Sequence, residues 1–283
     1  MAMLIPTEEL AAHLSDPGWI VIDTRHELTN PETGPRVYGE GHIPGAFFMH
    51  VDHDLSAPKD GRNGRHPLPD LQEFAAKLNA RGVDPGKQVV AYDDLGGNYA
   101  VRLWWMLRWL GHDKVAVLDG GYPLWLKEGR PVSKEVPAPR QGNFVPRPHL
   151  GDVVDAHFVQ RFSQSPEVRV VDARGVERFS GQQEPIDPVA GHFPGAVNRF
   201  WKANLEPDGR FKAAAKLRPE FEALMAGLAP AQVVHMCGSG VTACHNLFAM
   251  ELAGLSGSKL YPGSWSEWVA DPSRPVATGT GAR

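Results

Sequence analysis

The sequence of 283 residues contains two cysteines, and Cys237 has the surroundings of a nucleophile. Residues 233–236 form an apolar run typical of a buried strand, and a helical pattern begins near Thr242. Gly238 and Gly240 let the intervening backbone curl, so that successive amide N–H groups point inward. Such a loop at the amino end of a helix favours an anion, and the thiolate is the nucleophilic form of cysteine. The segment therefore predicts a loop that presents Cys237 as a thiolate.

Both cysteines also have a simpler interpretation as buried, unreactive side chains, which is common for a free thiol. For Cys237, the flanking glycines and the change from strand to helix favour catalysis. Cys244 falls within the predicted helix, and we interpret it as a small buried hydrophobe, with a redox partner as the alternative. Two cysteines supply neither a disulfide framework nor a structural zinc site.

The elements that must position this loop belong to a duplicated sequence. Gly-His-x-Pro-Gly-Ala occurs at 41–46 and again at 191–196, and the apolar run ending at Asp23 has a counterpart ending at Asp172. Two further landmarks recur in the same order, at a similar spacing of roughly 150 residues. Two copies of one domain explain this pattern. We predict domains at 1–145 and 146–283, with a proline-rich extended linker over about 130–150.

Each copy alternates short apolar runs with helical patterns. This alternation predicts an α/β fold in which a parallel sheet is covered by helices on both faces. The predicted strands are 20–22, 89–92, 115–118, 168–172, 232–236 and 258–261. The predicted helices are 70–78, 99–110, 217–228 and 242–254.

The composition is that of a soluble globular protein, with 42% hydrophobic and 22% charged residues. A net charge of -4 argues against binding to nucleic acid or to an anionic membrane. No apolar run reaches the roughly 18 residues that a membrane span needs. The first residues lack the features of a signal peptide, and so few cysteines suit a reducing compartment. We expect a cytoplasmic monomer.

The run Cys-Gly-Ser-Gly-Val-Thr-Ala at 237–243 resembles the active-site loop of mercaptopyruvate sulfurtransferases, which are two-domain members of the rhodanese family. The resemblance extends to both Gly-His-x-Pro-Gly-Ala copies and to residues 171–174 and 263–268. It implies two tandem rhodanese-like domains and a small-molecule sulfur donor. It also implies a persulfide on Cys237 and an acceptor such as thioredoxin, another thiol or cyanide. Neither a metal nor an organic cofactor is implied.

The resemblance also implies catalytic residues besides Cys237. Ser239, His66 and Asp52 match a relay that moves protons to the leaving enolate. His50 and His53 are alternatives for the histidine. His66 and Asp52 could instead order a surface loop.

Donor binding is implied for Arg178, whose planar guanidinium suits a carboxylate. The other residues implied to line the donor site are Gly238, Gly240, Val241 and Thr242. The alternative for Arg178 is a surface ion pair with Glu177 or Glu184. A second arginine of the mercaptopyruvate pattern is expected shortly after Glu184, but Asp187 stands there.

The N-terminal copy is implied to be non-catalytic, because Asp93 stands where the cysteine would fall and cannot carry a persulfide. Arg25 and Arg174 each follow an aspartate at a strand end. We expect them to brace the sheets through ion pairs rather than to contact the substrate.

The two indications of donor specificity disagree. Gly238 and Ser239 replace the basic residues that thiosulfate enzymes carry in this loop, whereas Asp187 replaces an arginine of the mercaptopyruvate enzymes. We predict 3-mercaptopyruvate as donor. Thiosulfate:cyanide sulfurtransferase and a non-catalytic persulfide carrier are the alternatives. A cysteine phosphatase is disfavoured because Ala243 stands where its arginine is required.

Overall fold

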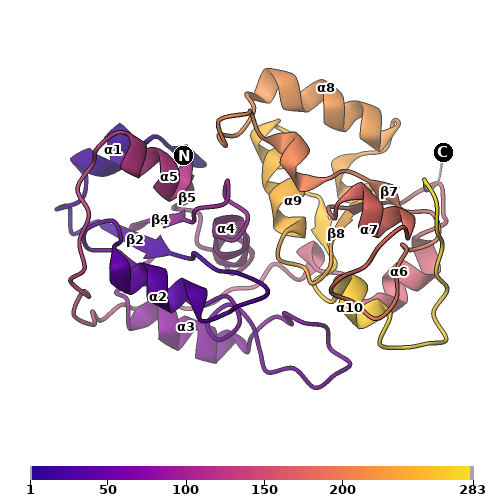
Figure 1. The fold of residues 1–283 in the computed structure, drawn as a ribbon, viewed down its shortest axis with the longest axis horizontal. Coiled ribbons are helices and arrows are strands. Elements are labelled where there is room, and N and C mark those ends of the chain that lie inside the picture. The colour runs from indigo at the N-terminus through magenta and orange to yellow at the C-terminus, as the bar shows by residue number, and fades with distance from the viewer. Residues whose placement is uncertain (1, 281–283) are drawn as a thin grey trace. The chain divides into compact units, whose positions relative to one another are not determined.

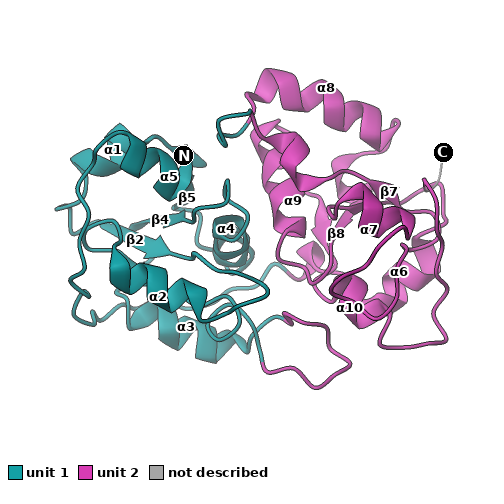
Figure 2. Ribbon diagram, in the orientation of Figure 1, with its two compact units in different colours: residues 1–57, 68–149, 207–211 teal, residues 58–67, 150–206, 212–283 magenta. Residues whose placement is uncertain are grey.

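The computed structural model describes residues 2–280, and the chain forms two compact units (Figure 2). Unit 1 consists of residues 1–57, 68–149 and 207–211, and unit 2 of residues 58–67, 150–206 and 212–283. The domain boundary near residue 145 stays a prediction. Segment 58–67 packs within unit 2, although it lies far from the C-terminal half in sequence. This placement matters for the site.

Unit 1 is built on a five-stranded parallel sheet in the order β1-β5-β4-β2-β3 (Figure 1). The strands are β1 (Leu4–Ile5), β2 (Trp19–Asp23), β3 (Phe47–Phe48), β4 (Gln88–Tyr92) and β5 (Val115–Leu118). The helices are α1 (Thr7–Ala12), α2 (Thr33–Glu40), α3 (Leu71–Asn79), α4 (Ala100–Trp109) and α5 (Gly121–Lys127). The central strands are short, apolar and almost wholly buried, as expected for a sheet covered on both faces.

Unit 2 repeats this plan with a four-stranded parallel sheet in the order β7-β6-β8-β9. The strands are β6 (Arg169–Asp172), β7 (Val197–Asn198), β8 (Val233–Met236) and β9 (Lys259–Leu260). The α-helices are α6 (Ala156–Phe162), α7 (Val176–Ser180), α8 (Ala214–Met225), α9 (Ala243–Leu252) and α10 (Ser264–Trp268). Short 3-10 turns lie at Leu150–Asp152, Trp201–Asn204 and Pro230–Gln232.

The two faces of the unit 2 sheet have separate apolar cores, because side chains alternate along a strand. Val170 and Val234 pack on one face with α6 and α10. Val171 and Val233 pack on the other face, against α8 and α9. The predicted parallel sheets with helices on both faces are thereby confirmed for this unit.

The inner strands and four of the helices match the sequence prediction, with differences at element ends. Helix α8 begins at Ala214 and ends at Met225, earlier than predicted, because Ala226 adopts a left-handed conformation with φ 52° that terminates it. The strands β1, β3 and β7 were not predicted. Each has two residues, too few to show a period.

An identical brace closes the carboxyl end of β2 and of β6. In unit 1, Arg25 Nη2 lies 2.6 Å from Asp23 Oδ2 and donates at 2.7 Å to the carbonyl of Gly41. In unit 2, Arg174 makes the equivalent ion pair with Asp172 at 2.6 Å and donates at 2.7 Å to the corresponding glycine carbonyl. The predicted bracing role of both arginines is confirmed.

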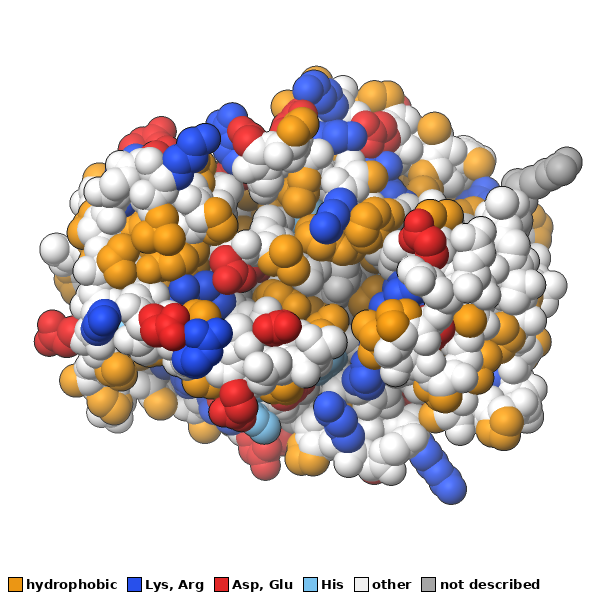
Figure 3. All heavy atoms as spheres, viewed as in Figure 1, with side chains coloured by type: hydrophobic (Ala, Val, Ile, Leu, Met, Phe, Trp, Pro, Cys, Tyr) orange, Lys and Arg blue, Asp and Glu red, His pale blue; other side chains and the backbone are white. Residues whose placement is uncertain are grey.

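Charged side chains of both signs are interspersed on the face of the molecule drawn in Figure 3. This distribution agrees with the small net charge of the sequence. None of the helices in the described part of the chain is long and apolar enough to cross a membrane.

Candidate active site

The loop after β8 holds the thiol of Cys237 against backbone N–H groups. The amides of Ser239 and Gly240 lie 3.4 Å and 3.2 Å from Cys237 Sγ and point toward it. Gly240 has φ +78°, and a β-carbon there would collide with the carbonyl of Pro262. Only glycine fits this position without a shift of the backbone. The loop thus has a geometry that stabilises negative charge on the sulfur.

The beginning of α10 holds this loop in place. Cys237 N–H donates to Ser264 Oγ at 3.1 Å. The N–H groups of Trp265 and Ser266 donate to the carbonyls of Cys237 and Gly238 at 3.0 Å and 2.9 Å. In the sequence, residues 263–268 served as part of the family resemblance. Their function as a support for the loop required the structure.

Segment 58–67 brings His66 to Ser239 within unit 2. The segment is fixed on α10, because Arg65 N–H donates to Ser266 Oγ at 3.0 Å. His66 is 3% exposed, and its Nδ1 lies 2.6 Å from Ser239 Oγ. This hydrogen bond joins two of the residues that the sequence assigned to the relay. The catalytic part of His66 stays a prediction.

The third predicted member of the relay lies in unit 1, where Asp52 N–H donates to His50 Nδ1 at 3.1 Å. The alternatives for the histidine, His50 and His53, lie in the same unit, and their rings pack 4.4 Å apart. Of the three candidate histidines, His66 is the one that lies in unit 2, where it is hydrogen-bonded to Ser239. The part of Asp52 in the relay stays a prediction.

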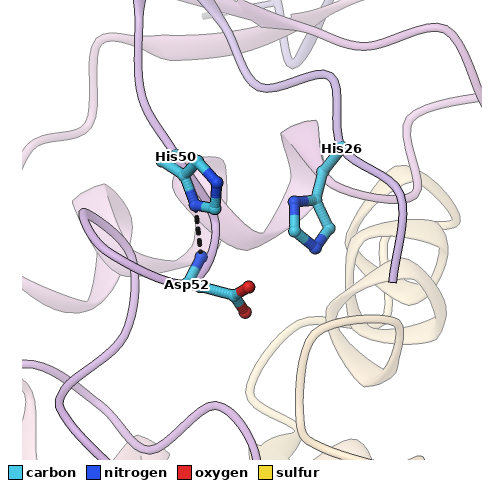
Figure 4. Close-up of side chains that lie close together, drawn as sticks. All are labelled: His26, His50 and Asp52. Carbon is cyan, nitrogen blue, oxygen red and sulfur yellow. Dashed lines mark hydrogen bonds between the residues drawn. The ribbon is translucent and has the colours of Figure 1, made fainter. Parts of the chain in front are cut away.

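Three side chains of unit 1, His26, His50 and Asp52, offer possible metal-ligand atoms within 4.8 Å of one another (Figure 4). Both ring nitrogens of His50 are already engaged, since Nδ1 accepts from Asp52 N–H and Nε2 lies 3.1 Å from the carbonyl of Pro31. A metal ion would have to displace one of these contacts. The expectation that the chemistry needs no metal stays a prediction.

Arg178, from α7, belongs to a cluster of ion pairs in which the carboxylates are buried and Arg178 is partly exposed. Its Nε donates to Glu184 at 2.9 Å and its Nη2 donates to Asp187 Oδ2 at 2.9 Å. The other oxygen of Asp187 accepts from Nη1 of Arg65. Both carboxylates are nearly inaccessible, with side-chain exposures of 2% for Glu184 and 3% for Asp187. The predicted alternative pairing with Glu184 is therefore present, but in a buried setting.

The guanidinium groups of Arg65 and Arg178 both lie against the cysteine loop. A β-carbon on Gly238 would come within 2.6 Å of Arg65 Nη2 and 3.4 Å of Arg178 Nη2. Burial lowers the pKa of Arg65, and the charge of Cys237 acts in the opposite direction. Arg65 was missed in the sequence. Its position immediately before His66 is the signal that could have indicated it.

The remaining loop residues lead into α9. Cys244 N–H donates to the carbonyl of Val241 at 3.1 Å, and Thr242 is the residue before the helix. The Cys244 thiol is fully buried and donates to the carbonyl of Gly240 at 3.4 Å. This environment suits a small hydrophobe. Donor contacts of Val241 and Thr242 stay predictions.

The corresponding loop of unit 1, after β4, contains Asp93. Its carboxylate accepts four backbone N–H groups, from Leu95, Gly97, Tyr99 and Ala100, at 2.7–2.9 Å. Burial raises the pKa of Asp93, and these four hydrogen bonds act to lower it. The same backbone design therefore surrounds a carboxylate in one unit and a thiol in the other.

Comparison with known proteins agrees with this duplicated architecture. The family model of the rhodanese-like domain matches residues 6–128 and 155–271. This protein belongs to the rhodanese family. It is an enzyme, a sulfurtransferase of the 3-mercaptopyruvate or thiosulfate kind, as its similarity to enzymes named for these activities supports.

Three of these similar proteins cover most of the chain. A "probable 3-mercaptopyruvate sulfurtransferase" of Pseudomonas aeruginosa is 49% identical over 98% of this chain and 99% of its own length. The thiosulfate sulfurtransferase of Bos taurus is 34% identical over 98% of this chain and 94% of its own. Among solved structures, 3-mercaptopyruvate sulfurtransferase from Leishmania major superimposes with a TM-score of 0.82. It is 29% identical and covers 94% of this chain and 74% of that one.

Proposed function

We propose that this enzyme takes sulfur from 3-mercaptopyruvate, carries it as a persulfide on Cys237, and passes it to a thiol such as thioredoxin or to cyanide. The observation that supports this donor is the buried hydrogen bond between His66 and Ser239 beside the cysteine loop. A hydroxyl and an imidazole in contact can move a proton. Loss of sulfur from mercaptopyruvate requires such a transfer, because the leaving group is an enolate that becomes pyruvate.

The first half-reaction begins with attack of the Cys237 thiolate on the sulfur of mercaptopyruvate. An S–S bond forms and the C–S bond breaks, and its electron pair goes to the enolate. The proton of the donor thiol ends on the methyl carbon of pyruvate, and the persulfide remains as an anion. In the second half-reaction, cyanide or a thiolate attacks the outer sulfur, the S–S bond breaks and the Cys237 thiolate returns.

Different residues of unit 2 contribute to different steps of these half-reactions. The amides of Ser239 and Gly240 stabilise negative charge on the sulfur. Arg178 and Arg65 bind the donor carboxylate beside Gly238. The Ser239 hydroxyl, which is hydrogen-bonded to His66, contacts the carbonyl oxygen of the donor and takes part in the proton transfer. We further propose that Asp52 orients His66, and that the N-terminal copy is non-catalytic.

Thiosulfate remains the second candidate donor, because a thiosulfate sulfurtransferase is 34% identical to this chain over 98% of its length. The cysteine loop itself disfavours thiosulfate. Gly238 and Ser239 add no positive charge to the site, which a doubly charged donor would need. A persulfide carrier with little turnover is the third candidate, and it would use the same Cys237.

A direct comparison of kcat/KM for 3-mercaptopyruvate and thiosulfate tests the proposal, and we expect mercaptopyruvate to be preferred. Mass spectrometry after incubation with donor should show one added sulfur atom on Cys237, and cyanide should remove it. A protein that gains sulfur but releases it without repeated turnover would be a carrier. If no sulfur adds to Cys237, both the enzyme and the carrier hypotheses fail.

A further inference from the structure

Asp187 places a buried carboxylate between the two arginines that face the cysteine loop. One oxygen accepts from Arg65 Nη1, and the other accepts from Arg178 Nη2 at 2.9 Å. Glu184 fixes the turn that carries it, because the N–H groups of Ile186 and Asp187 both donate to Glu184 Oε1 at 3.1 Å. Asp187 is therefore held rigidly, and it occupies one N–H group of each guanidinium.

The ion pairs around Asp187 contain as many acids as bases. Arg174 donates to Glu184 at 3.3 Å, which joins the Asp172 brace to the same cluster. The members are three guanidinium and three carboxylate groups: Arg65, Arg174 and Arg178 with Asp172, Glu184 and Asp187. Their formal charges cancel. A thiolate on Cys237 then makes the site negative by one charge before any donor binds.

We propose that Asp187 is a specificity-determining residue, which neutralises the arginine pair enough to favour singly charged sulfur donors over doubly charged ones. The inference deepens the proposed function and rests on it. Each added donor charge is repelled by the thiolate of Cys237 and by the carboxylate of Asp187, which pairs with both arginines that face the cysteine loop. Such repulsion is large where water is scarce. A donor with one carboxylate needs one favourable contact with Arg65 and Arg178, whereas a dianion such as thiosulfate needs net positive charge.

Alkylation of Cys237 measures the charge of this site without any sulfur donor. Iodoacetate is an anion and iodoacetamide is neutral, and both lose iodide to the same thiolate. The ratio of their second-order rate constants therefore reports the local field, since changes in thiolate reactivity affect both reagents. We expect Asp187→Asn to raise the iodoacetate-to-iodoacetamide ratio about threefold or more. A ratio that does not move would overturn the proposal.

Matched variants distinguish a local charge effect from other causes. Asp271→Asn removes the same charge from a half-exposed ion pair with Arg274, and it should leave the ratio unchanged. Arg65→Gln combined with Asp187→Asn restores the charge balance, and its ratio should lie within about twofold of wild type. Cys237→Ser corrects for reaction at Cys244. If Asp187→Asn alone does not fold, Arg65→Gln is compared with the double variant, where an equal ratio in the two overturns the proposal.

The donors themselves complete the test. In Asp187→Asn, kcat/KM for thiosulfate relative to mercaptopyruvate should rise about tenfold. A relative value that stays at the wild-type level, in a folded variant, contradicts the role of Asp187 in specificity. If the wild-type enzyme uses neither donor, the proposed function fails, whereas the alkylation ratio still decides whether Asp187 sets the charge.

Discussion

The loop after β4 in unit 1 and the loop after β8 in unit 2 occupy the same position in two similar sheets. Tyr92 pairs with Asp23 in the first sheet, as Met236 pairs with Asp172 in the second, and the next residues are Asp93 and Cys237. Asp93 receives four backbone N–H groups, whereas Cys237 Sγ receives two. The backbone can build an anion site from either sequence.

This difference fits a structural role for the unit 1 loop and the proposed catalytic role for the unit 2 loop. The carboxylate of Asp93 is a permanent part of unit 1 and satisfies amides that would otherwise be buried without an acceptor. The thiol of Cys237 satisfies fewer amides and forms weaker hydrogen bonds. It can therefore change its covalent state with little cost to the fold. Substitutions at matched positions in the two units can separate these roles.

The largest difference should appear in activity when Cys237 is replaced. Cys237→Ser should lower kcat by about 10³-fold or more, because a serine hydroxyl is neither ionised nor able to carry the sulfur. Urea unfolding should show a stability change below about 1 kcal/mol, since the neighbouring packing is kept. Cys244→Ala serves as control and should retain activity. Comparable loss in both variants would contradict the assignment of Cys237.

The unit 1 loop should respond in the opposite way. Asp93→Asn removes a carboxylate oxygen from a fully buried site and leaves amides without an acceptor, so the free energy of unfolding should fall by about 2–4 kcal/mol. Urea denaturation measures this change. Asp208→Asn, in an exposed pair with Arg210, is the matched control and should not change stability. A negligible effect of Asp93→Asn would mean that the four hydrogen bonds do not hold the loop.

The relay can be tested at Ser239, whose counterpart in the unit 1 loop is Leu95. Ser239→Ala removes the hydroxyl that meets His66 but keeps the backbone amide at Cys237 Sγ. The value of kcat/KM for mercaptopyruvate should fall by about 10- to 100-fold, because proton transfer to the enolate slows. With thiosulfate, which releases sulfite, it should change by less than about threefold. Equal losses with both donors would indicate that Ser239 only shapes the loop.

A smaller difference concerns the strands that lead into the two loops. His235 in β8 occupies the position of Ala91 in β4, and burial lowers the pKa of His235 to about 3. The unfolded chain therefore binds more protons than the folded one between about pH 3 and pH 6.5. In this window the contribution of His235 costs about 1.4 kcal/mol of stability for each unit that the pH falls.

Urea unfolding at pH 7 and pH 5 measures this dependence. His235→Gln should lose less stability than wild type on going to pH 5, by about 2 kcal/mol. His157→Gln, at an exposed position in the same unit, should keep the wild-type dependence. An identical pH dependence in wild type and His235→Gln would show that folding does not lower the pKa of His235.

Much of this protein could be predicted from its sequence because the decisive signals are local. A short apolar strand, a glycine-rich turn and a following helix are neighbours along the chain, so they mark Cys237 and its loop directly. The same pattern in the first half identifies Asp93 as the residue in the equivalent place. Repeated motifs then indicate two α/β units with parallel sheets. The two-residue strands β1, β3 and β7 could not be predicted in this way, because such short strands form through pairing with strands distant in the sequence.

The tertiary structure alone decided which side chains join Cys237. Segment 58–67 lies in sequence between two parts of unit 1 but packs on α10, and so Arg65 and His66 lie in unit 2. In the sequence, Asp187 stands where an arginine was expected. In the fold, its carboxylate bridges Arg65 and Arg178. No local pattern encodes the contacts of Arg65 with Asp187 and of His66 with Ser239, because each joins residues more than one hundred positions apart in the sequence. The local sequence therefore predicts Cys237 as the nucleophile and specifies its loop, whereas tertiary packing sets the charge that surrounds them.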